Sequence, residues 1–387
     1  MPKTEISLNM PDTNIAIIGC GFVADYYLTT LQDYPELKIA GVYDRNRDRA
    51  KSFAQYYSVY SYRSLEELLT DKQVDLVVNL TNPKSHFEIN LACLQAEKHV
   101  YSEKPLAMKL EDAKKLVDLA EQKNLYLSCA PCNLLSETAQ TIWKALREEK
   151  IGRVYSVYGE MDDGLIHKMP YKSWVSQSGI PWPYKDEFEV GCTLEHAGYY
   201  LSWFPAFFGR AESVTAFSSN LIEDKETDVA LEVNESDFSV ACIKFASGVV
   251  ARLTCSIIAP HDHSLKIFGD RGILSTKDCW FYNSPVRIKR FLNIRRKMIL
   301  SPIAQKYPLK GNQTKKFNYR AAFQMDFARG IAELVSAIGE NRPCRLSASY
   351  SLHVNEIVLA IHNARKTNGT YTVKSTFAPI EPMPWAK

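Results

Sequence analysis

The chain has 387 residues, of which 46% are hydrophobic and 24% are charged, and its net charge is +3. These values are typical of a globular protein of two or three domains, and so small a charge does not indicate nucleic acid or a membrane surface as the partner. No run of about 18 apolar residues occurs, so we expect no membrane-spanning helix. The N-terminal stretch MPKTEISLNMPDT lacks the apolar segment of a secretory signal, which predicts a cytoplasmic protein.

Some cysteines and histidines have the spacing of metal ligands. Nine cysteines, an odd number, argue against a disulfide framework and for a reducing compartment. Cys129 and Cys132 have CxxC spacing, but no second pair follows to complete a four-ligand zinc site. His261 and His263 flank Asp262 and could ligate a metal, yet no other ligand clusters beside them, and a polar turn is the favoured interpretation. The sequence therefore predicts no metal site.

The first 130 residues alternate short apolar runs with amphipathic stretches. Leucines and alanines at three- and four-residue spacing predict helices over 83–96 and 110–123. Strands alternating with helices of this length predict a doubly wound parallel sheet with helices on both faces, in a domain spanning 1–130. The expected strands are 14–18, 37–43, 74–80, 99–102 and 125–129.

After about residue 150 the pattern becomes that of an open, mainly antiparallel sheet, which predicts an α+β second domain over 131–387. The stretch FASGV at 245–249 predicts a hairpin turn in which Gly248 supplies the positive φ. Closing helices within 323–365 form part of this domain or pack back on the first one. The expected strands are 153–161, 237–245, 249–258 and 265–268, and the expected helices are 193–208, 323–339 and 347–365.

One segment has an unusual charge balance. No acidic residue lies between Asp278 and Asp326, while residues 287–320 hold eleven lysines and arginines. The favoured interpretation is an excursion from the sheet whose charges are solvated. A basic rim for an anionic substrate, such as a nucleotide- or phosphate-bearing sugar, and contact with an acidic surface are the alternatives.

The stretch NIAIIGCGFVA ends a predicted strand and opens a helix. Gly19, Gly21 and Ala24 fit the GxGxxG/A pattern, in which glycines allow a tight turn and close approach of a pyrophosphate. Phe22 and Val23 complete the turn, so that the pyrophosphate meets unpaired amides at the helix N-terminus. The sequence therefore predicts a dinucleotide site.

The end of the second strand predicts which dinucleotide is bound. Asp44 lies about 20 residues beyond the glycine motif, where an acidic side chain accepts hydrogen bonds from the ribose hydroxyls. Its charge disfavours a 2′-phosphate, so NAD is favoured, although the neighbouring Arg45 could accommodate that phosphate and keeps NADP open. Thr81 and Asn82 follow a later strand at the carboxyl edge, where such sheets bind ligands.

Three motifs together carry a family resemblance: the GxGxxA turn, Asn82-Pro83 followed by His86, and Glu103-Lys104-Pro105. The chain resembles the glucose–fructose oxidoreductase / inositol dehydrogenase / rhizopine-catabolism family over nearly its whole length. The resemblance implies that Lys104 is the acid/base residue beside the nicotinamide and that the bond before the proline is cis. It also implies that His86, Glu103 and Lys104 are cofactor contacts.

The second family signature is a helix with an aspartate and, four residues later, a histidine that faces the substrate. Counting back from Gly209 places Glu195 at the aspartate position and Tyr199 at the histidine position. A tyrosine here is similar to the dihydrodiol dehydrogenase and glucose–fructose oxidoreductase branches, where its hydroxyl serves in proton transfer. On an α-helix, Glu195 and Tyr199 share a face, whereas His196 is rotated away. His196 remains the alternative acid/base residue.

The resemblance implies an NAD(P)-dependent oxidoreductase acting on a sugar, sugar derivative or cyclitol, and a homo-oligomer, either a dimer or a tetramer. Lys104, Tyr199 and Glu195 are the expected catalytic residues. Lys185 and Trp174, with Tyr199 and His196, are the expected substrate contacts, because aromatic faces stack on sugar rings and a cation holds hydroxyls or a carboxylate. A glycosidase with transient oxidation by bound NAD and a catalytically silent NAD(P) sensor are the alternatives.

Overall fold

The computed structural model describes residues 13–309, 324–367 and 369–387, which divide into two compact units. Unit 1 comprises Met1–Ala130, Trp174–Trp182 and Phe327–Leu352, and unit 2 comprises Pro131–Ser173, Pro183–Asp326 and His353–Lys387. The second domain predicted over 131–387 includes residues 174–182. In the structure this segment belongs to unit 1, where Ser178 Oγ donates a 2.8 Å hydrogen bond to Asp25 Oδ2.

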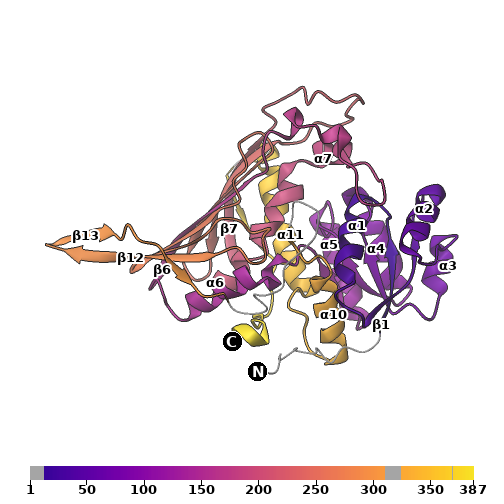
Figure 1. The fold of residues 1–387 in the computed structure, drawn as a ribbon, viewed down its shortest axis with the longest axis horizontal. Coiled ribbons are helices and arrows are strands. Elements are labelled where there is room, and N and C mark those ends of the chain that lie inside the picture. Colours follow the sequence, from indigo (N-terminus) through magenta and orange to yellow (C-terminus); the bar gives the residue numbers. More distant parts are fainter. Residues whose placement is uncertain (1–12, 310–323, 368) are drawn as a thin grey trace. The chain divides into compact units, whose positions relative to one another are not determined.

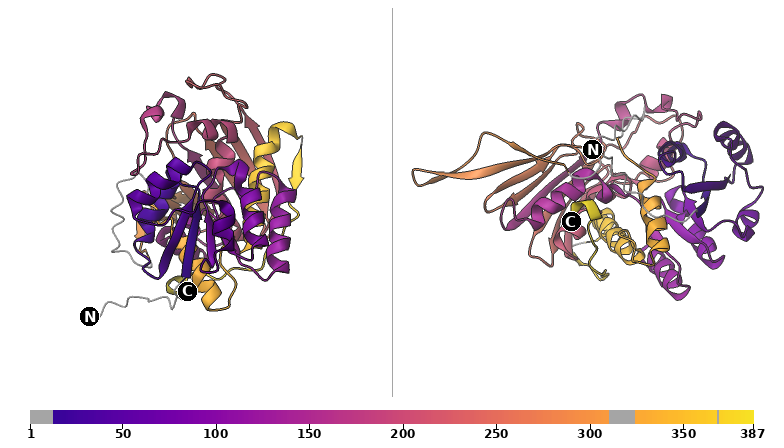
Figure 2. Two further views of the ribbon diagram at one scale, coloured as in Figure 1. Left: turned by 90° about the vertical axis from the view of Figure 1, so that its right-hand side faces the viewer. Right: turned by 60° about the horizontal axis from the view of Figure 1, so that its bottom comes forward.

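Unit 1 contains the predicted parallel sheet, in the order β2-β1-β3-β4-β5 (Figures 1 and 2). The order reverses between β1 and β3, and ligands bind outside the carboxyl ends of the strands at such a point. Buried aliphatic side chains dominate the strands, as expected for a sheet covered on both faces. The strands are β1 (Thr13–Ile18), β2 (Leu37–Tyr43), β3 (Leu76–Asn79), β4 (His99–Ser102) and β5 (Leu127–Cys129).

The helices of unit 1 follow the predicted alternation and have recognisable start signals. Asn46 caps the second helix by accepting hydrogen bonds from the backbone N–H groups of Asp48 and Arg49, both at 3.1 Å. The last helix of the unit packs on β4 and β5, where a Cβ at Gly330 would lie 2.3 Å from the hydroxyl of Tyr101. The helices are α1 (Phe22–Leu31), α2 (Arg47–Tyr57), α3 (Leu65–Thr70), α4 (His86–Gln95), α5 (Leu110–Gln122) and α10 (Arg329–Gly339).

Unit 2 contains a ten-stranded sheet in the described part of the chain, with nine strands in the order β13-β12-β11-β10-β6-β9-β8-β7-β15 and β14 paired to β12. Every pairing in it is antiparallel except that of β6 with β9. The predicted antiparallel second sheet is thus confirmed. Its strands are β6 (Val154–Asp162), β7 (Ala211–Ser219), β8 (Phe238–Phe245), β9 (Val250–Ser256), β10 (Leu265–Gly269), β11 (Gly272–Thr276), β12 (Val286–Ile294), β13 (Lys297–Leu300), β14 (Gln305–Tyr307) and β15 (Thr370–Thr372).

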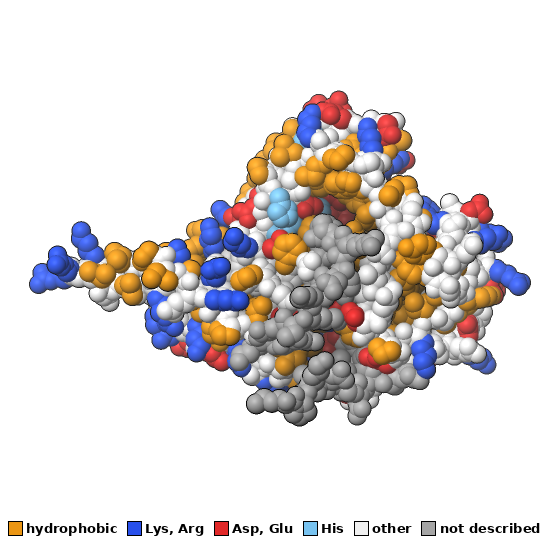
Figure 3. All heavy atoms as spheres, viewed as in Figure 1, with side chains coloured by type: hydrophobic (Ala, Val, Ile, Leu, Met, Phe, Trp, Pro, Cys, Tyr) orange, Lys and Arg blue, Asp and Glu red, His pale blue; other side chains and the backbone are white. Residues whose placement is uncertain are grey.

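The described part of the basic segment forms the hairpin of β12 and β13, which extends from one end of this sheet (Figure 1). The basic side chains gather at its tip, residues 295–297, and toward the sheet, and the stretch between them exposes apolar side chains, including Leu292, Ile294 and Met298 (Figure 3). Residues 310–323 of the predicted basic segment lie outside the described residues. The role of this segment as a substrate rim therefore stays a prediction.

The single helix predicted over 193–208 is wrong, because the structure divides it into three pieces. A π-helical turn, η5 (Thr193–Ala197), leads into α8 (Gly198–Leu201), and α9 (Phe204–Phe208) follows with Pro205 in its first turn. Proline has no backbone N–H to donate and is tolerated at the start of a helix, so Pro205 opens a new helix after α8. The remaining helices associated with unit 2 are α6 (Glu137–Arg147), α7 (Tyr184–Val190) and α11 (Ala348–His362), whose first residues, up to Leu352, belong to unit 1.

Short 3-10 turns complete the described structure. They are Pro83–Ser85, Asn133–Leu135, Ile166–Lys168, Tyr171–Ser173, Asn363–Lys366 and Pro384–Ala386. Within the described ranges no helix is both long and apolar enough to cross a membrane. All nine cysteines are free thiols, and all but Cys242 are buried.

Candidate active site

The glycine turn joins β1 to α1 in the geometry that a dinucleotide needs. Gly19 has φ +100°, and a Cβ there would lie 2.6 Å from the carbonyl oxygen of Leu80, so a larger residue does not fit. Gly21 caps α1 and has no heavy atom within 4 Å of the place where a Cβ would be. Phe22 opens the helix, and the buried Ala24 donates its N–H to the Gly21 carbonyl at 3.1 Å. The residues present therefore fit a pyrophosphate at this helix N-terminus.

Asp44 directly follows β2 beside this turn and already has several partners. Its Oδ2 accepts a hydrogen bond from the backbone N–H of Cys20 (2.9 Å), and its Oδ1 accepts one from Asn46 (2.8 Å). Arg49 donates from Nε to Oδ2 and from Nη2 to Oδ1, both at 3.0 Å. The cation beside Asp44 is therefore Arg49, whereas Arg45, which the sequence analysis considered, is exposed. Arg49 was not predicted from the sequence, although it lies only five residues beyond Asp44.

The loop after β3 is held by its own polar side chains. Asn79 Oδ1 accepts hydrogen bonds from the N–H and the hydroxyl of Thr81, at 3.1 and 2.7 Å. The buried His86 has Nε2 2.8 Å from the Thr81 carbonyl oxygen and Nδ1 2.6 Å from that of Pro105. Burial lowers the pKa of His86, although both carbonyl contacts favour the charged ring. This arrangement gives His86 a structural role between the two loops, and its predicted contact with the cofactor stays a prediction.

Lys104 follows β4, and the Lys104–Pro105 peptide bond is cis, as the resemblance implied. The buried Glu103 accepts a hydrogen bond from the Tyr27 hydroxyl (2.7 Å) and another from the backbone N–H of Lys104 (2.9 Å). One carboxylate oxygen thus anchors Glu103 to Tyr27, and the other fixes the backbone from which the Lys104 side chain departs. Because all five strands are parallel, the glycine turn, Asp44, Thr81 and Lys104 lie along the same carboxyl edge of the sheet.

The predicted catalytic residues of unit 2 lie on and directly after the π-helical turn. Glu195 and Tyr199 are both partly exposed, and the Tyr199 ring packs against Trp280 with centroids 5.3 Å apart. His196 is buried, with Nε2 2.8 Å from Glu187 Oε1 and Nδ1 3.6 Å from Asp163 Oδ2. π-turns occur frequently at functional sites, because the extra residue redirects side chains along the helix.

The predicted sugar contacts fall in different units. Lys185, on α7 in unit 2, lies 3.5 Å from Glu189 and 3.3 Å from Glu232, and the hydrogen bond to Glu232 raises its pKa. Trp174 belongs to unit 1 and packs edge-on against Trp182 with ring centroids 5.0 Å apart. The structure thus gives each of the two a partner within its own unit, and their role as substrate contacts stays a prediction.

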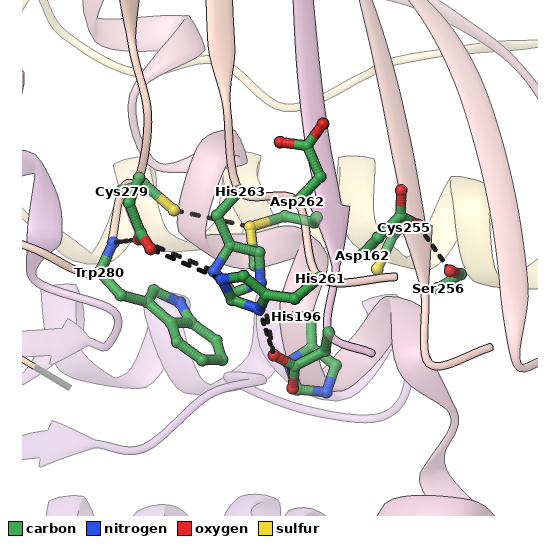
Figure 4. Close-up of polar contacts among 12 residues, drawn as sticks. Asp162, His196, Cys255, Ser256, His261, Asp262, His263, Cys279 and Trp280 are labelled. Atoms are coloured by element: carbon green, nitrogen blue, oxygen red, sulfur yellow. Dashed lines mark hydrogen bonds and ion pairs between the residues drawn. The ribbon is translucent and has the colours of Figure 1, made fainter. Parts of the chain in front are cut away.

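A cluster around His196 includes residues that the sequence analysis left out of the site (Figure 4). His263 is fully buried between Asp163 and Asp278, with its ring 4.2 Å from Trp280. Burial lowers the pKa of His263, but the two carboxylates more than offset this, so its net pKa is raised. The alternation of His261 and His263 was the signal in the sequence, and their partner Asp163 lies too far away along the chain to be connected with them by spacing.

A glycine turn at a switch point, an acidic residue after β2 and a lysine at the same sheet edge define a nicotinamide-dependent oxidoreductase. The comparisons with known proteins agree. Residues 13–130 match the model "Oxidoreductase family, NAD-binding Rossmann fold", and residues 139–275 match the GFO/IDH/MocA C-terminal domain. The chain belongs to the GFO/IDH/MocA oxidoreductase family, as its resemblance predicted.

The relatives are distant but cover most of the chain. The trans-1,2-dihydrobenzene-1,2-diol dehydrogenase of Bos taurus is 24% identical over 317 residues, which are 80% of this chain and 84% of the relative. Among solved structures, an NAD-binding oxidoreductase from Klebsiella pneumoniae has a TM-score of 0.74 at 19% identity, covering 94% of this chain and 99% of its own. A dehydrogenase from Bordetella pertussis in complex with NADH and UDP-GlcNAcA has a TM-score of 0.73 at 17% identity, with 94% and 98% covered.

Proposed function

We propose that the protein transfers a hydride between the nicotinamide of NAD and a secondary alcohol or ketone carbon of a sugar, sugar derivative or cyclitol. The observation that carries the proposal is the position of Lys104 on the carboxyl edge of the sheet, together with the glycine turn and Asp44. When bound, the nicotinamide supplies the hydride acceptor or donor. The residues of the chain supply proton transfer and orientation.

Lys104 is the proposed acid/base group at the reacting hydroxyl oxygen. The carboxylate of Glu103, anchored by Tyr27, holds the backbone N–H of Lys104 and so fixes the base of the lysine side chain. Tyr199 is the proposed second proton-transfer group, because an ammonium favours phenolate and phenolate favours the ammonium. Glu195 is proposed to position the lysine or a substrate hydroxyl. His196 is the alternative to Tyr199, although its ring is engaged by Glu187 at 2.8 Å.

Sugars carrying a nucleotide are the finer substrate proposal. The Bordetella relative was solved with UDP-GlcNAcA, and the described part of the basic segment supplies cations on the β12–β13 hairpin. A diphosphate would pair with such cations. NAD is proposed over NADP because Asp44 stands at the ribose position of β2, but its pairing with Arg49 weakens the repulsion of a 2′-phosphate.

A substrate screen tests the proposal. Neutral sugars, nucleotide sugars, cyclitols and trans-dihydrodiols are each incubated with NAD and with NADP, and the absorbance of the reduced nicotinamide is followed. Turnover of a sugar-like alcohol that is lost in Lys104→Ala supports the proposal. Cleavage of aryl glycosides without net reduction of cofactor would instead support the glycosidase, and cofactor binding without any turnover would support the sensor.

A further inference from the structure

Three side chains of unit 2 outside the proposed catalytic set point their ligand atoms toward one another. One ligand atom from each of Asp163, His261 and His263 lies within 4.8 Å of the other two. Asp163 Oδ1 is 3.4 Å from His263 Nε2 and 3.9 Å from His261 Nδ1, and the two imidazole centroids are 4.1 Å apart. Figure 4 shows the two rings side by side.

The backbone brings these residues together through a short antiparallel bridge. The N–H of Asp162 donates to the carbonyl of Asp262 at 3.0 Å, and the N–H of Asp262 donates back at 2.9 Å. Successive residues of an extended segment point to opposite sides, so His261 and His263 share the side opposite to Asp262. In Figure 4 the Asp262 carboxylate points away from the two rings. Asp163 follows Asp162 in the chain, and the N–H of Asp163 donates to the carbonyl of Ser256 at 2.8 Å.

The hydrogen bonding of His263 also points to a ligand at this group of side chains. Its side chain is fully buried, yet neither ring nitrogen makes a hydrogen bond of acceptable geometry. The two nitrogens have carboxylate partners only at ion-pair distances, with Asp163 Oδ1 3.4 Å from Nε2 and Asp278 Oδ1 3.7 Å from Nδ1. Buried polar groups in folded proteins are almost always hydrogen-bonded, so a buried imidazole without a closer contact suits a ring that binds a ligand between itself and Asp163.

The atoms of the three side chains that do not face one another make contacts like those around a metal centre. Metal-binding histidines direct their second ring nitrogen to a carboxylate, which fixes the ring. Asp278 occupies this position for both rings, since its Oδ2 is 3.7 Å from His261 Nε2 and its Oδ1 is 3.7 Å from His263 Nδ1. The other oxygen of Asp163 is likewise 3.6 Å from His196 Nδ1, and His196 in turn contacts Glu187 at 2.8 Å. The ligand set therefore has an orienting group on each member.

We propose that Asp163, His261 and His263 bind one divalent transition-metal ion, with zinc as the first candidate. Two imidazole nitrogens and one carboxylate oxygen suit Zn²⁺ and also Fe²⁺, Co²⁺ or Mn²⁺. Ligand atoms at roughly 2.0–2.1 Å from a tetrahedral ion are about 3.4 Å apart, which the contact between Asp163 and His263 already matches. The contact between Asp163 and His261 must shorten by about half an ångström. His261 is 52% exposed, so its side chain can move.

Three protein ligands leave one coordination position for water or for an oxygen of a small molecule. Hydride transfer between an alcohol and a nicotinamide needs no metal. The site therefore goes beyond the proposed function, and its occupancy can be measured without turnover.

Metal titration of the whole chain tests the site. The purified protein is treated with a chelator, and Zn²⁺ is titrated by calorimetry while Co²⁺ is titrated by visible absorption. We expect one ion per chain and a Co²⁺ spectrum without thiolate charge transfer, since the set contains no cysteine. His261→Ala and Asp163→Asn should each weaken binding by at least about tenfold.

The matched control is Asp262→Asn, which removes the same charge as Asp163→Asn from the neighbouring turn. Asp262 is exposed, and its Oδ1 accepts a hydrogen bond from the N–H of Ser264 at 2.9 Å, so the control should bind metal like the unaltered protein. His261 is more than half exposed, and its replacement by alanine should leave the circular dichroism spectrum unchanged. The proposal would be overturned if the unaltered protein bound neither ion. Unchanged binding in both His261→Ala and Asp163→Asn, or a thiolate signature in the Co²⁺ spectrum, would also overturn it.

Discussion

Arg49 makes a two-pronged contact with Asp44, with Nε 3.0 Å from Oδ2 and Nη2 3.0 Å from Oδ1. The carboxylate is buried, while the guanidinium is 34% exposed. Bidentate pairs of this kind are strong and directional, so Arg49 neutralises much of the charge that would repel a 2′-phosphate. We therefore expect cofactor preference in this protein to depend on this pair of residues rather than on Asp44 alone.

The first prediction concerns this pair. Asp44→Asn leaves one oxygen to accept from the neighbouring backbone N–H groups and removes the negative charge that pairs with Arg49. The freed Arg49 can then pair with a 2′-phosphate, so kcat/KM with NADP should rise about tenfold relative to NAD, equivalent to about 1.4 kcal/mol. Arg49→Ala should shift the ratio in the opposite direction. Steady-state kinetics with both cofactors measure the ratio. If either variant changed kcat/KM equally for NAD and NADP, the pair of Asp44 and Arg49 would not determine the cofactor preference.

The second prediction concerns Lys104. Replacing it by alanine should lower kcat at least about a hundredfold, because general acid/base groups contribute about that much or more. Binding of NAD, followed by the fluorescence of the reduced cofactor, should change little. Lys109→Ala is the matched control, since Lys109 is exposed five residues further on. Turnover by the Lys104 variant at the unaltered rate would remove this lysine from the mechanism.

The third prediction separates Tyr199 from His196. If the tyrosine hydroxyl moves the proton, Tyr199→Phe should lower kcat by about a hundredfold and remove one limb of its pH profile, since only the hydroxyl is lost. The ring contact with Trp280 is retained in this variant. His196→Gln should keep that limb. The reverse pattern would assign the acid/base role to His196.

The spacing of apolar residues predicted most of the strands and helices, because each of them buries an apolar side. The strands predicted over 37–43 and 99–102 match β2 and β4 residue for residue, since the apolar runs end where charged or turn residues begin. The prediction of a single helix over 193–208 was wrong for a local reason. The apolar pattern runs on across Pro205, but the backbone hydrogen bonding does not, and a π-turn leaves no periodic signature in so short a segment.

The parts of the candidate site that belong to a single contiguous motif could be predicted from the sequence. The glycine turn and the cis Lys104–Pro105 bond followed from contiguous motifs. The contacts that a side chain makes do not follow from such motifs. Both ring nitrogens of His86 contact backbone carbonyls, and its contact with the cofactor stays a prediction. The group formed by Asp163 and His263 depends on the pairing of segments far apart in sequence, which no spacing rule reveals.

The last prediction concerns the pH dependence of stability through His353. Its Nε2 accepts a hydrogen bond from the backbone N–H of Ala211 at 2.9 Å, and its Nδ1 lies 2.9 Å from Ser375 Oγ, an arrangement that requires the neutral ring. Burial lowers the pKa of His353 to about 4, with Arg210 opposing its protonation and Glu356 favouring it.

Because the folded pKa lies below the unfolded value of 6.5, the unfolded state takes up the proton first as the pH falls. The stabilisation by the neutral ring is complete above pH 6.5 and is lost progressively between pH 6.5 and pH 4. From pH 7 to pH 5 the free energy of unfolding should fall by about 2 kcal/mol through His353 alone. His353→Gln cannot take up this proton, so urea unfolding of the variant should lose about 2 kcal/mol less over the same interval. Equal losses in the variant and the unaltered protein would show that His353 is already protonated in the folded state at pH 5, and the hydrogen bond from Ala211 to its ring would then have to be absent in solution.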